Sequence, residues 1–132
     1  MNSRQKGFTL IELITVIVIL GALAVIALPR YIDLQTEAET AATEGVAGSL
    51  AAGAATNLAG VLAGNTAAAT VVTTCGDVPG TLNAGTLPTG YAIGNPAQSL
   101  GTSNGDTADC GLDNTNISPT VSVTFRGYYA SY

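Results

Sequence analysis

The sequence predicts an α+β protein in which one long N-terminal helix packs against a small antiparallel β-sheet head with one disulfide. Three observations lead to this fold class. Residues 8–28 form an apolar run of membrane length, residues 29–64 continue with apolar side chains at helical spacing, and residues 65–132 are rich in Thr, Gly, Asn and Ser. A chain of 132 residues suits one domain, so we expect a single functional unit.

The run 8–28 is long enough to cross the hydrocarbon core of a membrane as a helix. Arg4 and Lys6 precede it, and basic residues on that side favour a cytoplasmic N-terminus with export of the rest of the chain. The clearly polar residues within the run are Thr9, Glu12 and Thr15. The run therefore predicts a segment that enters a membrane.

Glu12 is the residue in this run that needs an explanation, because a carboxylate inside a bilayer is costly. A cleaved secretory signal ending at Ala22-Leu23-Ala24 is one interpretation of the run, and Glu12 counts against it. A second interpretation is structural: Thr9 and Glu12 have the spacing of a capping box, which stabilises the start of a helix.

The segment Lys6-Gly7-Phe8-Thr9-Leu10-Ile11-Glu12-Leu13 resembles the processing signature of type IV prepilins. This resemblance implies that residues 1–7 are a leader, which a prepilin peptidase removes between Gly7 and Phe8 before it methylates the new amine of Phe8. It also implies a role for Glu12 in assembly, since a carboxylate at this position can neutralise that amine and set the register between subunits.

The helix is expected to continue past the apolar run, with a kink at Pro29, which lacks an N–H to donate. The residues 29–35, Pro-Arg-Tyr-Ile-Asp-Leu-Gln, resemble the same stretch of mannose-sensitive haemagglutinin-type pilins. An amphipathic pattern to about Gly64 is indicated by Leu34, Ala38, Ala41, Ala42, Val46 and Leu50. Glycines weaken this part, and either close packing offsets them or the helix frays; they are Gly45, Gly48, Gly53, Gly60 and Gly64.

Residues 65–132 are expected to form the β-rich head. Extended runs occur at 69–74, 91–93 and 121–125, and a turn at Arg126-Gly127 would lead into a last strand at 128–132. Tyr residues in that last segment are either half-buried on the sheet, which we favour, or a contact patch. They are Tyr128, Tyr129 and Tyr132.

Cys75 and Cys110 are the only cysteines and both lie on the side of the chain expected to be exported. An even pair in that setting predicts a disulfide, with two free buried thiols as the alternative. A bridge closing a loop of this length contributes about 4 kcal/mol in the chain-entropy model. A small Gly-rich head needs such a constraint, because it buries little apolar surface.

No metal or other cofactor is expected. Asp106, Asp109 and Asp113 are weak candidates for calcium, but their spacing does not fit an EF-hand loop, and Asx-rich turns have the same composition. The sequence has no His, which excludes His-based catalytic and metal sites, and a net charge of −5 disfavours nucleic acid. We therefore expect a protein that is not an enzyme.

The resemblance implies a structural subunit, a major pilin, that polymerises through its N-terminal helix into an extracellular filament for adhesion, motility or related surface functions. Its implied partners are identical subunits, the prepilin peptidase, the assembly machinery of the inner membrane, and the membrane itself before assembly. Two alternatives remain. One is a pseudopilin of type II secretion, which calcium and a missing disulfide would favour, and the other is a small periplasmic binding protein with a cleaved signal.

Overall fold

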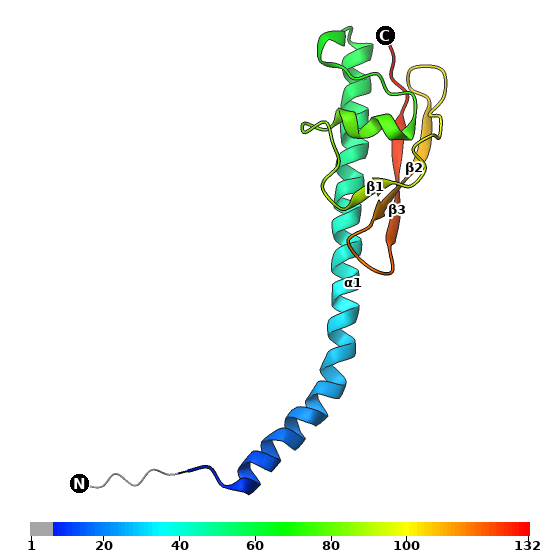
Figure 1. The fold of residues 1–132 in the computed structure, drawn as a ribbon. Coiled ribbons are helices and arrows are strands. Elements are labelled where there is room, and N and C mark those ends of the chain that lie inside the picture. The colour runs from blue at the N-terminus through cyan, green and yellow to red at the C-terminus, as the bar shows by residue number, and fades with distance from the viewer. Residues whose placement is uncertain (1–6) are drawn as a thin grey trace, which may run out of the picture. The chain divides into compact units, whose positions relative to one another are not determined.

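A computed structural model describes residues 7–132 of the chain, so Arg4, Lys6 and most of the expected leader lie outside the described residues. The chain divides into two compact units, Met1–Ala38 and Glu39–Tyr132. The described part of the first unit is mainly helix. The second unit holds the rest of that helix and a three-stranded antiparallel sheet, which confirms the α+β fold class (Figure 1).

Helix α1 spans Leu10–Leu62, a length of 53 residues. It runs through Pro29 without interruption, so loss of one backbone donor does not end it. Its part in the first unit, residues 10–38, is exposed at every position. The first unit therefore has no core of its own in the described chain.

Within the second unit, α1 buries one narrow face. The buried residues recur at intervals of three, four and seven, as expected for a helix that contacts a layer on one side: Thr43, Ala47, Leu50, Ala54 and Val61. The amphipathic prediction was partly wrong, because Leu34, Ala38, Ala41 and Ala42 are exposed. The first buried residue of α1 is Thr43, and these apolar residues before it are covered by nothing in the described chain.

Gly64 lies just beyond the end of α1. Its φ of 78° is in the left-handed region that favours glycine. The backbone N–H of Asn65 donates to the carbonyl of Gly60 at 3.0 Å, and the N–H of Gly64 donates to that of Val61, also at 3.0 Å. These bonds satisfy carbonyls that the end of a helix leaves without partners.

The sheet has the strand order β1-β2-β3, with β1 at Tyr91–Ile93, β2 at Thr107–Asn114 and β3 at Val121–Tyr128. Both pairings are antiparallel; Tyr91 lies opposite Asn114, and Cys110 lies opposite Phe125. Two short 3₁₀ helices, η1 at Thr66–Ala68 and η2 at Cys75–Thr81, lie between α1 and the sheet in the sequence.

The central strand β2 was not predicted. The sequence interpretation left this Asx-rich stretch as a turn, but its residues alternate between the core and the solvent. The turn expected at Arg126-Gly127 is also wrong, since both residues lie inside β3. Tyr128 ends β3, and the segments 69–74 and 129–132 contribute isolated bridges, between Val72 and Ala130 and between Thr74 and Ser99.

One hydrophobic core joins the second unit's part of α1 to the head. From the helix it takes Ala47, Leu50, Ala54 and Val61; from the head it takes Val72, Cys75, Val78, Leu100, Cys110, Leu112, Phe125 and Ala130. Leu50 and Leu112 are fully buried, and Phe125 from β3 is 5% exposed. Burial of this kind stabilises by about 25 cal/mol per Å² of apolar surface, and it fixes the sheet against the helix.

Candidate functional site

The N-terminal end of α1 is stabilised by a reciprocal cap. The carboxylate of Glu12 accepts hydrogen bonds from the backbone N–H of Thr9 at 2.8 Å and from the Thr9 hydroxyl at 2.7 Å, both at Oε2. The N–H of Glu12 donates to Thr9 Oγ1 at 3.4 Å. This is the capping box that the spacing of the two residues predicts.

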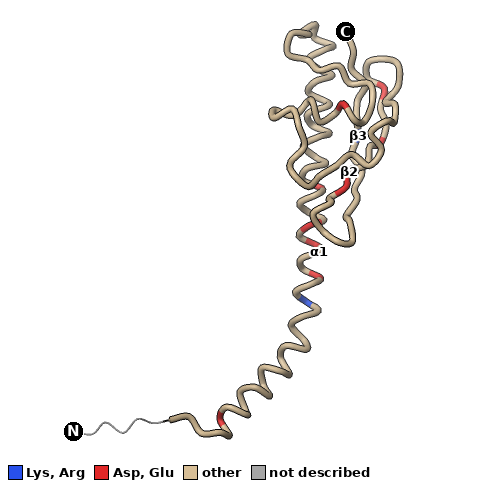
Figure 2. Tube along the Cα trace, in the orientation of Figure 1, with Lys and Arg blue, Asp and Glu red and all other residues tan. Residues whose placement is uncertain are grey.

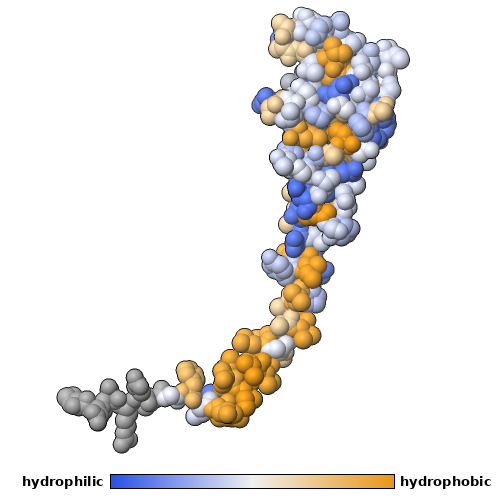
Figure 3. Space-filling model, in the orientation of Figure 1, coloured by the Kyte–Doolittle hydropathy of each residue, from blue (hydrophilic) through white to orange (hydrophobic). Residues whose placement is uncertain are grey.

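The first unit exposes an apolar surface of unusual extent. Every large apolar side chain from Leu10 to Leu28 is exposed, from 42% at Ile14 to 75% at Val25. Figure 3 shows this surface as an orange zone over the N-terminal part of the helix, and Figure 2 shows how sparse charge is there. In the sequence, Glu12 is the one charged residue of this stretch, and Arg30 is the next. Isolated exposed apolar residues are ordinary, but a continuous patch indicates contact with a membrane or a protein.

By length and composition, α1 is the one described helix that could cross a membrane, and its apolar window is not buried. Signal sequences share this length and composition. The position of the helix is more specific, because α1 begins three residues after Gly7.

Gly7 and Phe8 precede the helix and are both exposed, with Phe8 91% accessible. The structure thus leaves the expected junction outside the helix. Pro29 lies inside α1, and the kink expected there stays a prediction.

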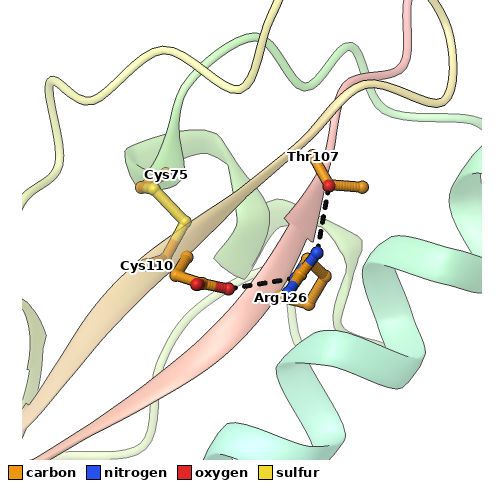
Figure 4. A network of polar contacts seen from close by, with 5 residues as sticks. Cys75, Thr107, Cys110 and Arg126 are labelled. Carbon is orange, nitrogen blue, oxygen red and sulfur yellow. Dashed lines mark hydrogen bonds and ion pairs between the residues drawn. A yellow bond between two sulfur atoms is a disulfide. The ribbon is translucent and has the colours of Figure 1, made fainter.

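The expected disulfide is confirmed. Cys75, at the start of η2, bonds to Cys110, in the middle of β2, with 5.6 Å between their Cα atoms. Both cysteines are fully buried. Figure 4 shows the bridge beside an exposed ion pair, in which Arg126 Nε lies 3.0 Å from Asp109 Oδ1, and Arg126 Nη1 donates to Thr107 Oγ1 at 3.2 Å.

The three weak calcium candidates do not form a cluster. Asp106 accepts the backbone N–H groups of Thr102 and Ser103, both at 2.9 Å, and these bonds hold its pKa below the usual value for an aspartate. Asp109 pairs with Arg126, and Asp113 lies further along β2. Within residues 7–132, no group of three or more metal-ligating side chains comes together.

The tyrosines near the C-terminus were expected either to be half-buried on the sheet or to form an exposed contact patch. Tyr128 and Tyr129 pack against the hydrophobic core, as favoured. Tyr132 is 66% exposed, and its hydroxyl donates to the carbonyl of Ala69 at 3.1 Å.

Asp77 was missed by the sequence reasoning. One of its oxygens, Oδ2, accepts the backbone N–H and the hydroxyl of both Thr73 and Thr74, at 2.8 to 3.1 Å. Partial burial disfavours its charged form, but these four hydrogen bonds outweigh burial and lower the pKa of Asp77. The signal was the Thr74-x-x-Asp77 spacing, the same pattern as Thr9-x-x-Glu12.

A second missed group connects α1 to the sheet. Asn114 is 1% exposed at the end of β2, and its amide donates to Thr43 Oγ1 at 3.3 Å and to Glu39 Oε2 at 3.2 Å. Thr43 in turn donates to the carbonyl of Glu39 at 2.7 Å. No sequence signal joins residues this far apart; only the packing of sheet on helix does.

Known proteins are similar to the N-terminal part of the chain. A family model described as the prokaryotic N-terminal methylation motif matches residues 2–28. Among curated proteins, the type IV narrow pilus major component PilA5 of Thermus thermophilus is 51% identical over 47 residues, which are 36% of this chain and 40% of that protein. The N-terminal part of the chain is thus similar to that of type IV pilins. The finer resemblance to the mannose-sensitive haemagglutinin type stays a prediction.

Two further curated proteins are similar to the chain over part of its length. The type IV major alpha-pilin of Moraxella bovis is 57% identical over 53 residues, 40% of this chain and 31% of that protein. The type IV major pilin protein PilE1 of Neisseria gonorrhoeae is 59% identical over 39 residues, 30% of this chain and 24% of that protein. The chain thus spans well under half the length of these relatives, and no solved structure matches it.

Proposed function

We propose that this chain is a structural subunit, a major pilin, of a type IV pilus, and that it polymerises through the first part of α1 into an extracellular filament for adhesion, motility or related surface functions. The observation that carries the proposal is the continuous apolar surface of α1 from Leu10 to Leu28, which nothing in the described chain covers. Relatives named as major components of type IV pili support it.

Processing precedes assembly in this proposal. Residues 1–7 act as a leader that a prepilin peptidase removes between Gly7 and Phe8, and the new amine of Phe8 is then methylated. The match of residues 2–28 to the N-terminal methylation motif supports this step. So does the position of Gly7 and Phe8 outside the helix, since they are accessible to an enzyme.

Cleavage creates the amine that the carboxylate of Glu12 neutralises in this proposal. The new amine of Phe8 is cationic, and a carboxylate nearby stabilises it where the dielectric constant is low. Thr9 occupies Oε2 of Glu12, while Oε1 accepts no hydrogen bond from the described chain. A cap of this kind holds the carboxylate in place and leaves one oxygen for an amine from a neighbouring subunit.

Before assembly, the apolar part of α1 resides in the inner membrane; afterwards it lies in the filament interior against the same segment of other subunits. Lipid is as apolar as the neighbouring helices, so this exchange yields little hydrophobic free energy by itself. Extraction therefore needs the assembly machinery and ATP hydrolysis. Many identical weak contacts then add up to a stable fibre.

The test is intact and N-terminal mass spectrometry of material sheared from the cell surface, with and without reduction. We expect N-methylated Phe8 as the first residue, and a mass higher by about 2 Da after reduction because the disulfide takes up two hydrogens. A first residue after Ala24 would instead indicate a cleaved secretory signal and a periplasmic protein.

A pseudopilin of type II secretion is the remaining alternative, and it predicts the same N-terminus but no chain in the sheared fraction. The buried Cys75–Cys110 bridge supports the pilus subunit over this alternative, which a missing disulfide would have favoured. Electron microscopy of the sheared fraction, with antibody against the chain, distinguishes the two.

A further inference from the structure

Arg30 and Glu37 are exposed charged residues of α1 that lack a partner in their own chain. Within residues 7–132, neither side chain forms an ion pair or a hydrogen bond. Arg30 is also the only basic residue between Phe8 and the end of α1. By contrast, Glu12 is held by Thr9 and Glu39 by Asn114. Because both residues are on one exposed helix, the basic residue of one copy can pair with the acidic residue of a second copy.

We infer that Arg30 of one subunit forms an ion pair with Glu37 of a neighbouring copy lying parallel to it, shifted along the helix by seven residues. The inference rests on the proposed filament, because only an assembly brings two such helices together. The filament would then have two charged contacts between neighbouring helices: one between Phe8 and Glu12, and one between Arg30 and Glu37.

The required shift follows from helix geometry. Seven residues of α-helix rise by about 10.5 Å and return to nearly the same face after two turns. This shift sets Arg30 of the displaced copy level with Glu37 of the other copy. The apolar side chains of both helices stay in phase, so the ion pair and the apolar contact are compatible.

The proposed contact between Phe8 and Glu12 is compatible with the same shift. Phe8 precedes the first helical residue, Leu10, by two non-helical residues, which span up to about 7 Å. Glu12 lies two residues into the helix, or about 3 Å above Leu10. When these two residues extend along the helix axis, a copy displaced by about 10 Å brings its Phe8 amine level with Glu12 of the other copy.

The faces of the helix agree as well. Glu12 and Glu37 are 25 residues apart in the sequence, which at 100° per residue leaves them about 20° apart around the axis. One neighbouring helix can therefore approach both carboxylates.

Asp33 is the competing partner for Arg30, and the geometry disfavours it. Pairing Arg30 with Asp33 needs a shift of three residues, about 4.5 Å, which in the same extended arrangement leaves the Phe8 amine about 5 Å short of Glu12. A charge pair of this kind contributes more to register than to affinity, because misaligned copies bring unlike charges out of contact. Glu37 is thus the acid that satisfies both contacts at once.

Charge reversal tests the pair in the full chain, expressed in cells that assemble filaments. We expect Arg30→Glu and Glu37→Arg each to reduce sheared filament about tenfold, and the double variant to recover it. Arg30→Glu combined with Asp33→Arg is the matched control and should not recover. Single variants with normal filament, or recovery by the Asp33 control instead, would overturn the inference. Leader removal, measured in the same cells, separates assembly defects from misfolded chains.

Cross-linking tests the same contact without reversing charge. The chain has no free cysteine among its described residues, so oxidised filaments of an Arg30→Cys, Glu37→Cys variant should yield a ladder of linked subunits. Arg30→Cys with Asp33→Cys should yield none, and the reverse result would contradict the inference. Absence of filaments from the unmodified chain would count against the proposed function instead, which keeps the two failures apart.

Discussion

At the scale of single residues, two carboxylates perform the same local task. Glu12 and Asp77 each accept a backbone N–H and a hydroxyl from the Thr three positions earlier. The first pair was predicted because it opens a long apolar helix. The second was missed because Thr74 and Asp77 precede a Gly- and Pro-containing segment that does not suggest a helix. The same Thr-x-x-acid spacing gives the same hydrogen bonds in both places, but a cap can be predicted only where the following residues also indicate a helix.

Replacement of Glu12 by Ala separates processing from assembly. We expect the Glu12→Ala chain to lose its leader normally, since the junction lies outside the helix, and to give far fewer filaments, because the amine of Phe8 has no carboxylate to neutralise it. Immunoblots of whole cells and of the sheared fraction measure the two steps. Normal filament yield would contradict the assembly role of Glu12.

Asp77 makes head stability depend on pH. Its pKa is lower in the folded chain than in the unfolded chain, so the stabilisation is present above the ordinary aspartate pKa and is lost as pH falls through the folded value. We expect Asp77→Asn to lower the free energy of unfolding by about 1–2 kcal/mol at neutral pH. The difference from the unmodified chain should shrink below about pH 4.

Thermal unfolding of the full chain in detergent, followed by circular dichroism across that pH range, measures this effect. Asp109→Asn is a suitable control, because Asp109 is in an exposed ion pair of little energetic value. Equal pH profiles for Asp77→Asn and the unmodified chain would refute the role of Asp77.

At the scale of elements, the structure separates the glycines of α1 into two kinds. A Cβ added at Gly45 would meet nothing within 4 Å, whereas one added at Gly53 would meet Thr81 Oγ1 at 2.8 Å. That hydroxyl is itself held, since it donates to the carbonyl of Val78 at 2.8 Å. Close packing against the head therefore explains Gly53 but not Gly45, and the helix remains continuous through both.

This difference predicts opposite effects of one chemical change. Gly45→Ala should stabilise the chain by about 1 kcal/mol, because alanine favours the helix and has room. Gly53→Ala should destabilise it by about 1–3 kcal/mol, because the methyl group displaces Thr81. The midpoints of thermal unfolding of the two variants measure the effects, and a shift of the same sign in both would be contrary to expectation.

At the scale of the whole molecule, the second unit depends on a long-range covalent link. The bridge joins η2, which follows the helix in the sequence, to the central strand of the sheet, and both sulfurs lie in the core. Such a bridge limits the conformations of the unfolded chain. A small head with many glycines gains much from that limit, since its apolar core is small.

Removal of both cysteines tests this dependence. We expect Cys75→Ser together with Cys110→Ser to lower the free energy of unfolding by about 2–4 kcal/mol, and to reduce the amount of assembled filament at growth temperature. Chemical denaturation of the purified full chain measures the first effect. An unchanged midpoint would show that the bridge contributes little.

The residue pattern predicts two of the three strands. Strand β1 matches the predicted run 91–93 and β3 contains the predicted run 121–125, because aromatic and β-branched residues favour extended backbone. Strand β2 carries Asp109, Asp113 and Asn114, residue types typical of turns. Its buried positions are Cys110, Leu112 and Asn114, an alternation that becomes evident only when the sheet and helix that bury them are in place.

The sequence by itself determined the N-terminal half of this protein. The cap of Glu12, the apolar run and the helix are local features, since spacing and composition specify them within a few residues, whereas cleavage between Gly7 and Phe8 stays a prediction. Only the tertiary structure decided which residues meet across the head: Asn114 with Thr43, Asp77 with its threonines, and β2 between its neighbours. These contacts depend on burial between segments far apart in the chain, and burial cannot be assigned before the packing is known.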